Sequence, residues 1–340
     1  MRRSLRTIAA PLAAAVLMVL AFRAPLPYFT ERPGALFGLD GRVAVQGHPE
    51  PLHGDVLFGT VNVRGATLVA AVRAALERDV QLVRRERLIP EGLDSQAFFE
   101  QQQAEFALAA DVAAAVGLRA AGLPVEPDAL RGEGALVLRV VRGGPAQRRL
   151  RPGDVVTAVN ARPVTTDGEY HAVVDALAWE PMTLTVQRDG VVQDIAITPA
   201  ATRAGRPSVG LVVSTFRPQV SLPVPVRLSD IRVGGPSAGL AIALTVYDRV
   251  AAEDLLAGRV VAATGTLDTR GRVGPIGGVG LKAIAADRAA VDVLLVPAEQ
   301  LEQARQAGGD TRVRIVGVAT FDEALEALRE AAARRPRAAA

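Results

Sequence analysis

The first feature of the hydrophobic pattern is an uncharged, apolar run close to the N-terminus. It covers residues 7–22, and arginines precede it at positions 2, 3 and 6. A basic tip followed by an apolar run is typical of a signal sequence or a signal anchor. The run is sixteen residues long, shorter than the roughly 20 that span a bilayer. Residues 24–29 nevertheless continue it, and Tyr28 and Phe29 suit the membrane interface.

This pattern predicts that residues 1–30 form a cytoplasmic basic tip and an uncleaved transmembrane anchor. The positive-inside rule then places the rest of the chain outside the cytoplasm, at the cell membrane. A cleaved signal sequence is the alternative. Phe22-Arg23-Ala24 lacks the pair of small residues that a cleavage site favours, so we prefer the anchor.

Beyond the predicted anchor, short strand-like runs alternate with helical patterns. Residues 55–58 and 60–63 have the pattern of strands, whereas residues 66–79 and 94–121 have the apolar spacing of helices. We interpret the three glutamines at 101–103 as a polar face of the second helix. The prediction is an extracytoplasmic α/β region that covers residues 31–130.

Residues 131–200 have the alternation of a small β-rich domain. Apolar and polar positions alternate over short runs, and turn residues separate these runs. The expected elements are strands at 135–141, 155–159, 182–188 and 191–197, a hairpin turn at Asp189-Gly190, and a helix at 166–177 with Thr166 or Asp167 as its N-cap.

Residues 205–333 mix both periods, which predicts an α+β or an α/β domain. The fold class of the whole chain is therefore α+β: a β-rich domain followed by an α/β domain, after the N-terminal transmembrane anchor. The expected strands lie at 209–213, 260–265, 293–296 and 312–316, and the expected helices at 237–251, 281–289 and 321–333.

The composition excludes several classes of function. The net charge is only +3 and the arginines are scattered, so we expect no nucleic-acid partner. Cysteine is absent, which excludes disulfides, thiolate metal sites and a cysteine nucleophile. The three histidines show no metal-site spacing, and we expect neither a metal nor another cofactor.

The chain has a single lysine, Lys282, among its 39 basic residues. Arginine supplies every other basic side chain. Arginine cannot be deprotonated in a protein, whereas a buried lysine can lose its proton and act as a base. Lys282 is therefore a candidate for proton transfer. The alternative is a chance survivor of a codon bias.

A serine stands at the expected start of the helix at 237–251. N–H groups at a helix start have no intrahelical partner and can stabilise an oxyanion. The small residues around the serine let a peptide backbone approach. On this segment alone, an ordinary serine cap explains the pattern as well. The candidates are Ser237 as nucleophile, with Gly235, Pro236, Ala238 and Gly239 as the surrounding oxyanion and backbone residues.

A glycine-rich loop leads to Lys282. Residues 264–273 have the pattern of a hairpin, and the loop at 274–280 follows them. A nucleotide-binding P-loop has glycine before its lysine and serine or threonine after it. Leu281 and Ala283 occupy these positions. We therefore do not expect a phosphate-binding loop.

Residues 205–333 resemble the proteolytic domain of Lon-type serine proteases. The resemblance rests on the Gly-Pro-Ser-Ala-Gly run at 235–239, the Thr264-Gly265 turn, the Pro-Ile-Gly-Gly run at 275–278, and the lysine 45 residues after the serine. It implies that Ser237 is the nucleophile, Lys282 its general base and Thr264 a supporting residue. It also implies a homo-oligomer, a hexameric ring.

Two departures from the Lon pattern change these expectations. Many Lon domains have an acid where this chain has Gly234, so regulation through that acid is not expected. A Walker motif is absent as well. Proteolysis driven by ATP on the same chain is therefore not expected.

Residues 131–200 resemble a bacterial PDZ domain. The resemblance rests on the Gly-Gly-Pro-Ala run at 143–146 and on the runs at 150–156 and 159–164. The carboxylate-binding loop of such a domain is expected around residues 131–134, where no such loop is recognisable.

The whole chain resembles the membrane-anchored, PDZ-containing Lon-like proteins of bacteria. The resemblance implies an ATP-independent serine endopeptidase, active outside the cytoplasm, that cleaves proteins or peptides and captures chain termini through the PDZ-like domain. The alternative function is a membrane-tethered binding module with an inactive or autoinhibited protease fold.

Overall fold

The structure is a computed structural model. It describes residues 22, 25–77, 79–88, 95–126, 129–202, 205–231, 233–309 and 311–333. The apolar run at 7–22 therefore lies outside the described residues, apart from Phe22. Within the described part of the chain, none of the helices combines the length and the apolar character that crossing a bilayer requires.

The chain folds into two compact units, and the first of them is discontinuous in sequence. The first unit combines Met1–Val125 with Leu222–Ala340, and the second unit is Glu126–Ser221. These bounds differ from the predicted ones. The region at 31–130 is not separate, because its strands share a sheet with strands from the C-terminal third of the chain.

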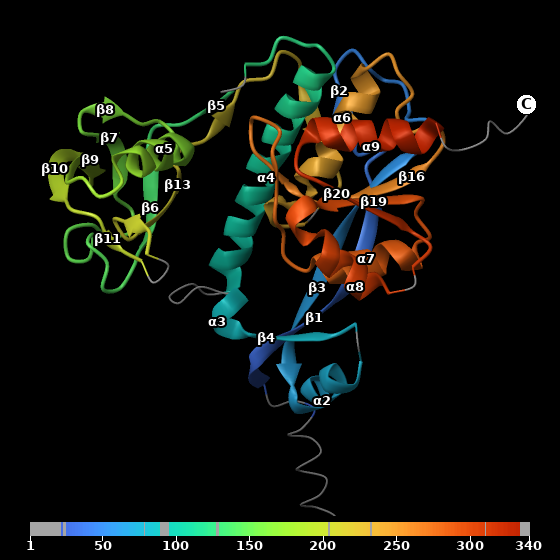
Figure 1. The fold of residues 1–340 in the computed structure, drawn as a ribbon, viewed down its shortest axis with the longest axis horizontal. Helices are drawn as coiled ribbons and strands as arrows, with labels where there is room; N and C mark the ends of the chain where they lie inside the picture. The colour runs from blue at the N-terminus through green and yellow to red at the C-terminus, as the bar shows by residue number, and fades with distance from the viewer. Residues whose placement is uncertain are drawn as a thin grey trace, which may run out of the picture. The chain divides into compact units, whose positions relative to one another are not determined.

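A six-stranded mixed sheet forms the centre of the first unit (Figure 1). Its C-terminal strands are parallel to one another and to β3, which β1 joins in an antiparallel ladder. The order is β20 (Arg314–Val318), β19 (Val293–Pro297), β16 (Val260–Ala263), β3 (Asp55–Thr67), β1 (Pro25–Gly38) and β4 (Gln81–Arg84).

One consequence is a correction to the predicted anchor. Residues 25–30 were expected to belong to it, but they lie in β1. There Phe29 pairs with Gly65 of β3 on one side and with Val83 of β4 on the other. Backbone pairing on both sides places this apolar stretch within a sheet, and local hydropathy cannot reveal such pairing.

Helices cover the sheet of the first unit, and two of them form its buried centre. α6 is buried from Gly239 to Tyr247, and α4 packs against it. Gly117 of α4 permits the close approach, since a Cβ there would lie 2.6 Å from the carbonyl oxygen of Ala243. The helices are α2 (Leu68–Leu76), α3 (Arg85–Leu88), α4 (Ser95–Ala120), α6 (Gly239–Val250), α7 (Val279–Arg288), α8 (Leu301–Gly308) and α9 (Phe321–Ala333).

Two short antiparallel pairs complete the first unit. β2 (Val43–Val45) pairs with β15 (Val226–Leu228), and β17 (Thr266–Leu267) pairs with β18 (Val273–Gly274). The second pair confirms the hairpin predicted at 264–273. The predicted helices at 66–79, 94–121, 281–289 and 321–333 are confirmed within a few residues.

The second unit is a six-stranded antiparallel sheet with one helix packed on it. Its core includes Tyr170 of the helix and Leu184 of the sheet. The side chain of Thr166 caps the helix by accepting a hydrogen bond from the Glu169 N–H, as predicted. The order is β10 (Val191–Ile197), β9 (Met182–Arg188), β7 (Val155–Val159), β6 (Ala135–Val140) and β13 (Leu211–Thr215), with α5 at Asp167–Leu177 and short β8 (Arg162–Pro163) beside β7.

The strand β13 corrects a second boundary. A strand at 209–213 was expected in the last domain. In the structure β13 pairs with β6, so it is the edge strand of the second unit. The remaining short pairs are β5 (Leu130–Arg131) with β14 (Gln219–Val220) and β11 (Ala200–Ala201) with β12 (Pro207–Ser208).

Candidate active site

Ser237 lies in a single turn of 3₁₀-helix, Pro236–Ala238, directly before α6. Gly235 precedes this turn with φ of 86°, a conformation that glycine adopts without strain. Pro236 then fixes the first helical φ. The carbonyl oxygen of Ser237 accepts two hydrogen bonds, from the Gly265 N–H at 3.0 Å and from the Thr264 hydroxyl at 3.1 Å. The turn is therefore fastened to the segment that follows β16.

Lys282 approaches this serine from the first turn of α7. Its Nζ lies 2.6 Å from Ser237 Oγ and 3.0 Å from Thr264 Oγ1. The structure thus brings together the three side chains that the sequence singled out. The distance between Nζ and Oγ is short enough for direct proton transfer.

Thr264 orients the lysine amine. Its hydroxyl donates to the Ser237 carbonyl, so its lone pairs face Lys282 and accept an N–H from Nζ. A neutral amine has one lone pair and two N–H groups. With one N–H directed at Thr264, the lone pair is free to face the serine hydroxyl.

Lys282 is almost fully buried, with 4% of the residue exposed. This burial lowers the pKa of Lys282 to about 8, because removal of water disfavours the charged form. Ile276, Val279 and Leu281, which lie near Lys282 in sequence, are all buried. About a tenth of the Lys282 side chains are therefore neutral at pH 7.

Strands β1 and β3, from the N-terminal part of the chain, pack around the Lys282 side chain. The sequence did not suggest this contact. A Cβ on Gly59 of β3 would lie 3.4 Å from Lys282 Cγ and 3.1 Å from a methyl group of Leu36 in β1. Gly278, which precedes α7 in the left-handed conformation, lies against Val61 of β3. A Cβ on Gly278 would be 2.6 Å from Val61 Cγ2. A glycine within a strand often marks such a close approach, and Gly59 carried this signal.

Helix α4 holds the loop before the serine. The Gly235 N–H donates to the backbone carbonyl of Gln102 over 2.8 Å. A Cβ on Gly234 would lie only 2.7 Å from Gln102 Cβ. Gly234, where many Lon domains have an acid, is therefore the point at which α4 contacts the loop. The glutamine run, interpreted as a polar face, makes this contact.

The structure reduces the number of backbone N–H groups near Ser237 that could stabilise an oxyanion. Gly235 donates its N–H to Gln102, Pro236 has no N–H, and Gly239 donates to the Pro236 carbonyl. Ala238 lies buried behind the serine. The Ser237 N–H belongs to the first helical turn, where such groups lack intrahelical partners. It is the backbone donor that best fits an oxyanion.

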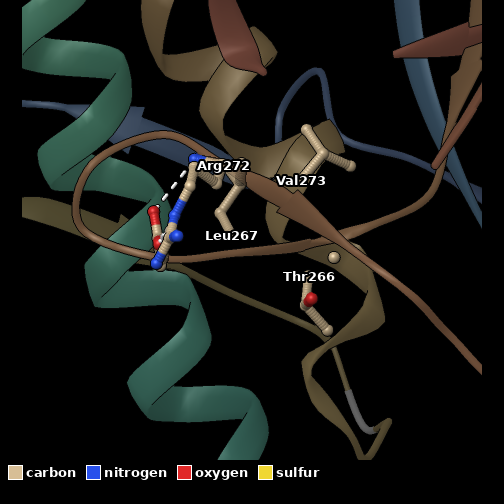
Figure 2. A pocket seen from close by; sticks show the side chains of 6 residues that line it. Thr266, Leu267, Arg272 and Val273 are labelled. Atoms are coloured by element: carbon tan, nitrogen blue, oxygen red, sulfur yellow. Dashed lines mark hydrogen bonds and ion pairs between the residues drawn. The ribbon is translucent and has the colours of Figure 1, made fainter. Parts of the chain in front are cut away.

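A shallow depression of about 390 Å³ borders this turn. Its wall is the β17–β18 hairpin, and Leu267 lies against the start of α6: a Cβ on Gly239 would be 3.3 Å from the Leu267 nitrogen. Arg272, labelled in Figure 2, donates a hydrogen bond from Nε to Asp268 Oδ2 over 2.6 Å. The lining residues all belong to the segment 266–274.

Comparison with known families shows which protein domains this chain is similar to. Residues 180–329 match the family model of the Lon protease (S16) C-terminal proteolytic domain, and residues 111–198 match the PDZ domain model. The chain carries a Lon-type proteolytic domain and a PDZ domain. This confirms the resemblance seen in the sequence, and the Lon domain supports a serine peptidase.

Curated relatives are Lon proteases. Lon protease 2 of Herpetosiphon aurantiacus is 32% identical over 146 residues, which are 42% of this chain and 18% of that protein. The Lon protease of Roseiflexus castenholzii is 31% identical over 173 residues, 45% of this chain and 21% of that protein. The chain thus spans about a fifth of the length of these relatives.

Among solved structures, the PDZ domain of an SdrC-like protein from Listeria innocua is similar. It is 20% identical, and the match covers 24% of this chain and 92% of that one with a TM-score of 0.23. The Lon match itself begins at residue 180, so it leaves out β1, β3 and α4. The elements that bury Lys282 and hold the serine loop thus lie outside the matched segment.

Proposed function

We propose that the protein is a serine endopeptidase that works through a Ser237–Lys282 dyad. The single observation that carries the proposal is the 2.6 Å contact between the serine hydroxyl and a buried amine. The lowered pKa of that amine, about 8, makes it a base in the range where a peptidase works. The match to the Lon domain supports the same reaction class.

In the proposed mechanism, neutral Lys282 accepts the proton of Ser237 while Oγ attacks the carbonyl carbon of a peptide bond. The Ser237 N–H stabilises the resulting oxyanion. The lysine ammonium then protonates the leaving amine, and the C–N bond breaks. Lys282 next removes a proton from water, which attacks the acyl ester. The carboxylic acid leaves and Ser237 recovers its proton.

The second unit is proposed to capture substrate chains. The loop at 131–134 cannot serve as an open carboxylate site, because the Glu133 N–H donates to Phe216 and the Gly134 N–H donates to Thr165. β13 is an edge strand instead, and α5 packs beside it. A peptide could add to this edge by strand pairing, which suits an extended terminus of a protein substrate.

The cellular setting belongs to the same proposal. The basic tip and the apolar run at 7–22 support an anchor that leaves the catalytic body outside the cytoplasm. With no Walker motif in the sequence, we propose that cleavage does not require ATP. Resemblance to Lon supports a hexameric ring. No cofactor and no nucleic-acid partner enter the proposal.

The direct test is the Ser237→Ala variant. It should abolish peptide cleavage and labelling by a serine-directed acylating probe, while circular dichroism and melting temperature remain those of the wild type. Ser229→Ala, at an exposed serine of the segment before the loop, is the matched control and should keep full activity. Wild-type turnover by Ser237→Ala would exclude Ser237 as the nucleophile.

The alternative function is a tethered binding module with an inactive protease fold. The edge strand β13 is compatible with this function, because a peptide can bind to an edge strand without being cleaved. The acylating probe separates the two functions. Labelling of Ser237 in the unmodified chain supports the peptidase, and an unlabelled but folded chain supports the binding module.

A further inference from the structure

Helix α2 presents a row of large apolar side chains to solvent. Leu68, Val72 and Leu76 are 53%, 55% and 79% exposed. They stand four residues apart, so they lie on one face of the helix. The apolar face of a helix in a globular domain usually covers a core. Here another apolar face covers the strands, and this row points outward.

The row belongs to a larger apolar end of the first unit. Within the described residues of this unit, six of the seven exposed large hydrophobic side chains lie between residues 22 and 82. A concentration of this kind marks an interaction surface, since single exposed apolar residues are normally scattered. The six residues, called the α2 surface below, are Phe22, Val63, Leu68, Val72, Leu76 and Leu82.

The course of the chain indicates what covers the α2 surface. Pro25, the first residue of β1, pairs with Thr67, the N-cap of α2. Phe22, the last residue of the apolar run at 7–22, stands three residues earlier and can be no more than about 10 Å from Pro25 along the chain. Phe22 therefore lies close to the start of α2. Figure 1 shows α2 and β4 together at the end of the long β1–β3 ladder.

Charge around the α2 surface is mixed, so apolar burial dominates. Glu77 lies 2.9 Å from Arg73, and Asp79 pairs with an arginine at the end of α7. Arg64 and Arg84 are exposed at the same end, and arginine stems can lie along headgroups while their charge remains hydrated. The surface thus suits the boundary between headgroups and acyl chains, with little dependence on anionic lipid.

We infer that the α2 surface docks on the bilayer as a second membrane contact, with α2 lying in the interface plane. The inference rests on the proposed anchoring through the apolar run at 7–22. A single transmembrane anchor attaches the protein stably but leaves the body free to turn about the point of attachment. The second contact fixes how the first unit is oriented at the membrane.

The absence of cysteine allows a clean test. The full chain, reconstituted in phosphatidylcholine vesicles, carries one polarity-sensitive fluorophore on Val72→Cys. Its emission should shift to the blue on reconstitution, and quenchers on the lipid acyl chains should quench it. Val260→Cys is the control in the same unit, because Val260 pairs with Asp55 at the far end of the 13-residue strand β3. That end lies on the order of 40 Å away, and its label should stay water-exposed.

The outcomes separate this inference from the anchoring it rests on. If the chain floats with vesicles but the Val72 label behaves as in water, the inference fails and the anchor stands. The labels could instead quench one another when two labelled copies meet, with no effect of the lipid quenchers. That result would assign the α2 surface to contact with a second copy and overturn the inference. If the chain does not float with vesicles at all, both proposals fall.

A double variant adds a functional readout. Val72→Gln with Leu76→Gln replaces exposed side chains, so the fold and the labelling of Ser237 in detergent should persist. A label on Leu68→Cys should be quenched several-fold less by the acyl-chain quenchers in the variant than in the otherwise unmodified chain, while the anchor keeps both on the vesicles. Equal quenching in the two chains would contradict a membrane role for α2.

Discussion

At the residue scale, the site depends on the difference between lysine and arginine. Every basic side chain but one is arginine, and the exception is buried against the serine hydroxyl. Burial of an arginine here would leave a permanent charge without water. Burial of a lysine instead lowers its pKa and yields a neutral base. The chemistry explains why this one position differs.

The pH dependence follows from that pKa. Only neutral Lys282 can accept the serine proton, so kcat/KM should rise with pH and level off above the pKa of about 8. Near pH 7 about a tenth of the lysine is neutral, by the ordinary titration relation. Initial rates on an uncharged peptide between pH 6 and 9.5 measure the profile. A flat or falling profile would argue against a lysine base.

At the element scale, local pattern predicted most helices and strands but not their partners. The bounds of β9, β10 and α9 are those expected, because each has a clear period and a turn signal at its end. β13 and β1 were assigned to the wrong part of the chain. Their partners lie far away in sequence, and a period of two does not say which sheet a strand joins.

The same distinction holds for the site. Ser237 and Lys282 were predicted because each stands in a motif with its own chemistry, and Thr264 was predicted from the resemblance to Lon domains. Gly59 and Gln102 were not, since their roles depend on close approach between distant segments. The Gln102 contribution comes from its backbone carbonyl, so no side-chain pattern could reveal it. The residues that were missed act through packing between segments distant in sequence, which local secondary-structure propensity does not reveal.

Helix α4 should control the serine loop through Gly234. In Gly234→Ala the new Cβ would lie 2.7 Å from Gln102 Cβ, so helix or loop must move. We expect kcat to fall at least tenfold, since small displacements of a nucleophile are costly, while the Lys282 pKa in the pH profile changes little. Stopped-flow peptide hydrolysis measures the change.

The control is Gly168→Ala in α5, where a Cβ would meet only a 3.8 Å contact. It should leave activity unchanged. Adding Gln102→Gly to Gly234→Ala removes the colliding atom and should restore part of the rate. Equal activity of Gly234→Ala and wild type would show that α4 does not restrain the loop.

At the scale of the whole molecule, the second unit is inserted into the first. Residues from both flanks of the insertion build the sheet that carries the site, and no sheet among the described residues joins the two units. One flank ends in α4, which contacts the serine loop, and the other leads through β15 toward Ser237. Each connection to the second unit therefore joins a segment that contacts the serine loop or leads into it.

This organisation predicts that the second unit can be excised. With residues 126–221 replaced by a short Gly/Ser linker, the first unit should fold, label at Ser237 and cleave short peptides. Cleavage of unfolded protein substrates should fall relative to short peptides, because the capture surface is lost. Comparing the two substrates in one assay measures this ratio. An excised chain that folds but cleaves both substrates at the wild-type ratio would remove the capture role.

The most direct test of the dyad compares Lys282→Arg with Lys282→Ala. The measured quantity is the rate at which a serine-directed probe acylates Ser237, followed by intact mass at pH 8. Arginine keeps the positive charge but cannot accept a proton, so both variants should lose acylation to a similar, large extent. Acylation by Lys282→Arg at a rate close to that of the wild type would show that the side chain acts only as a charge, and the account of Lys282 as general base would be wrong.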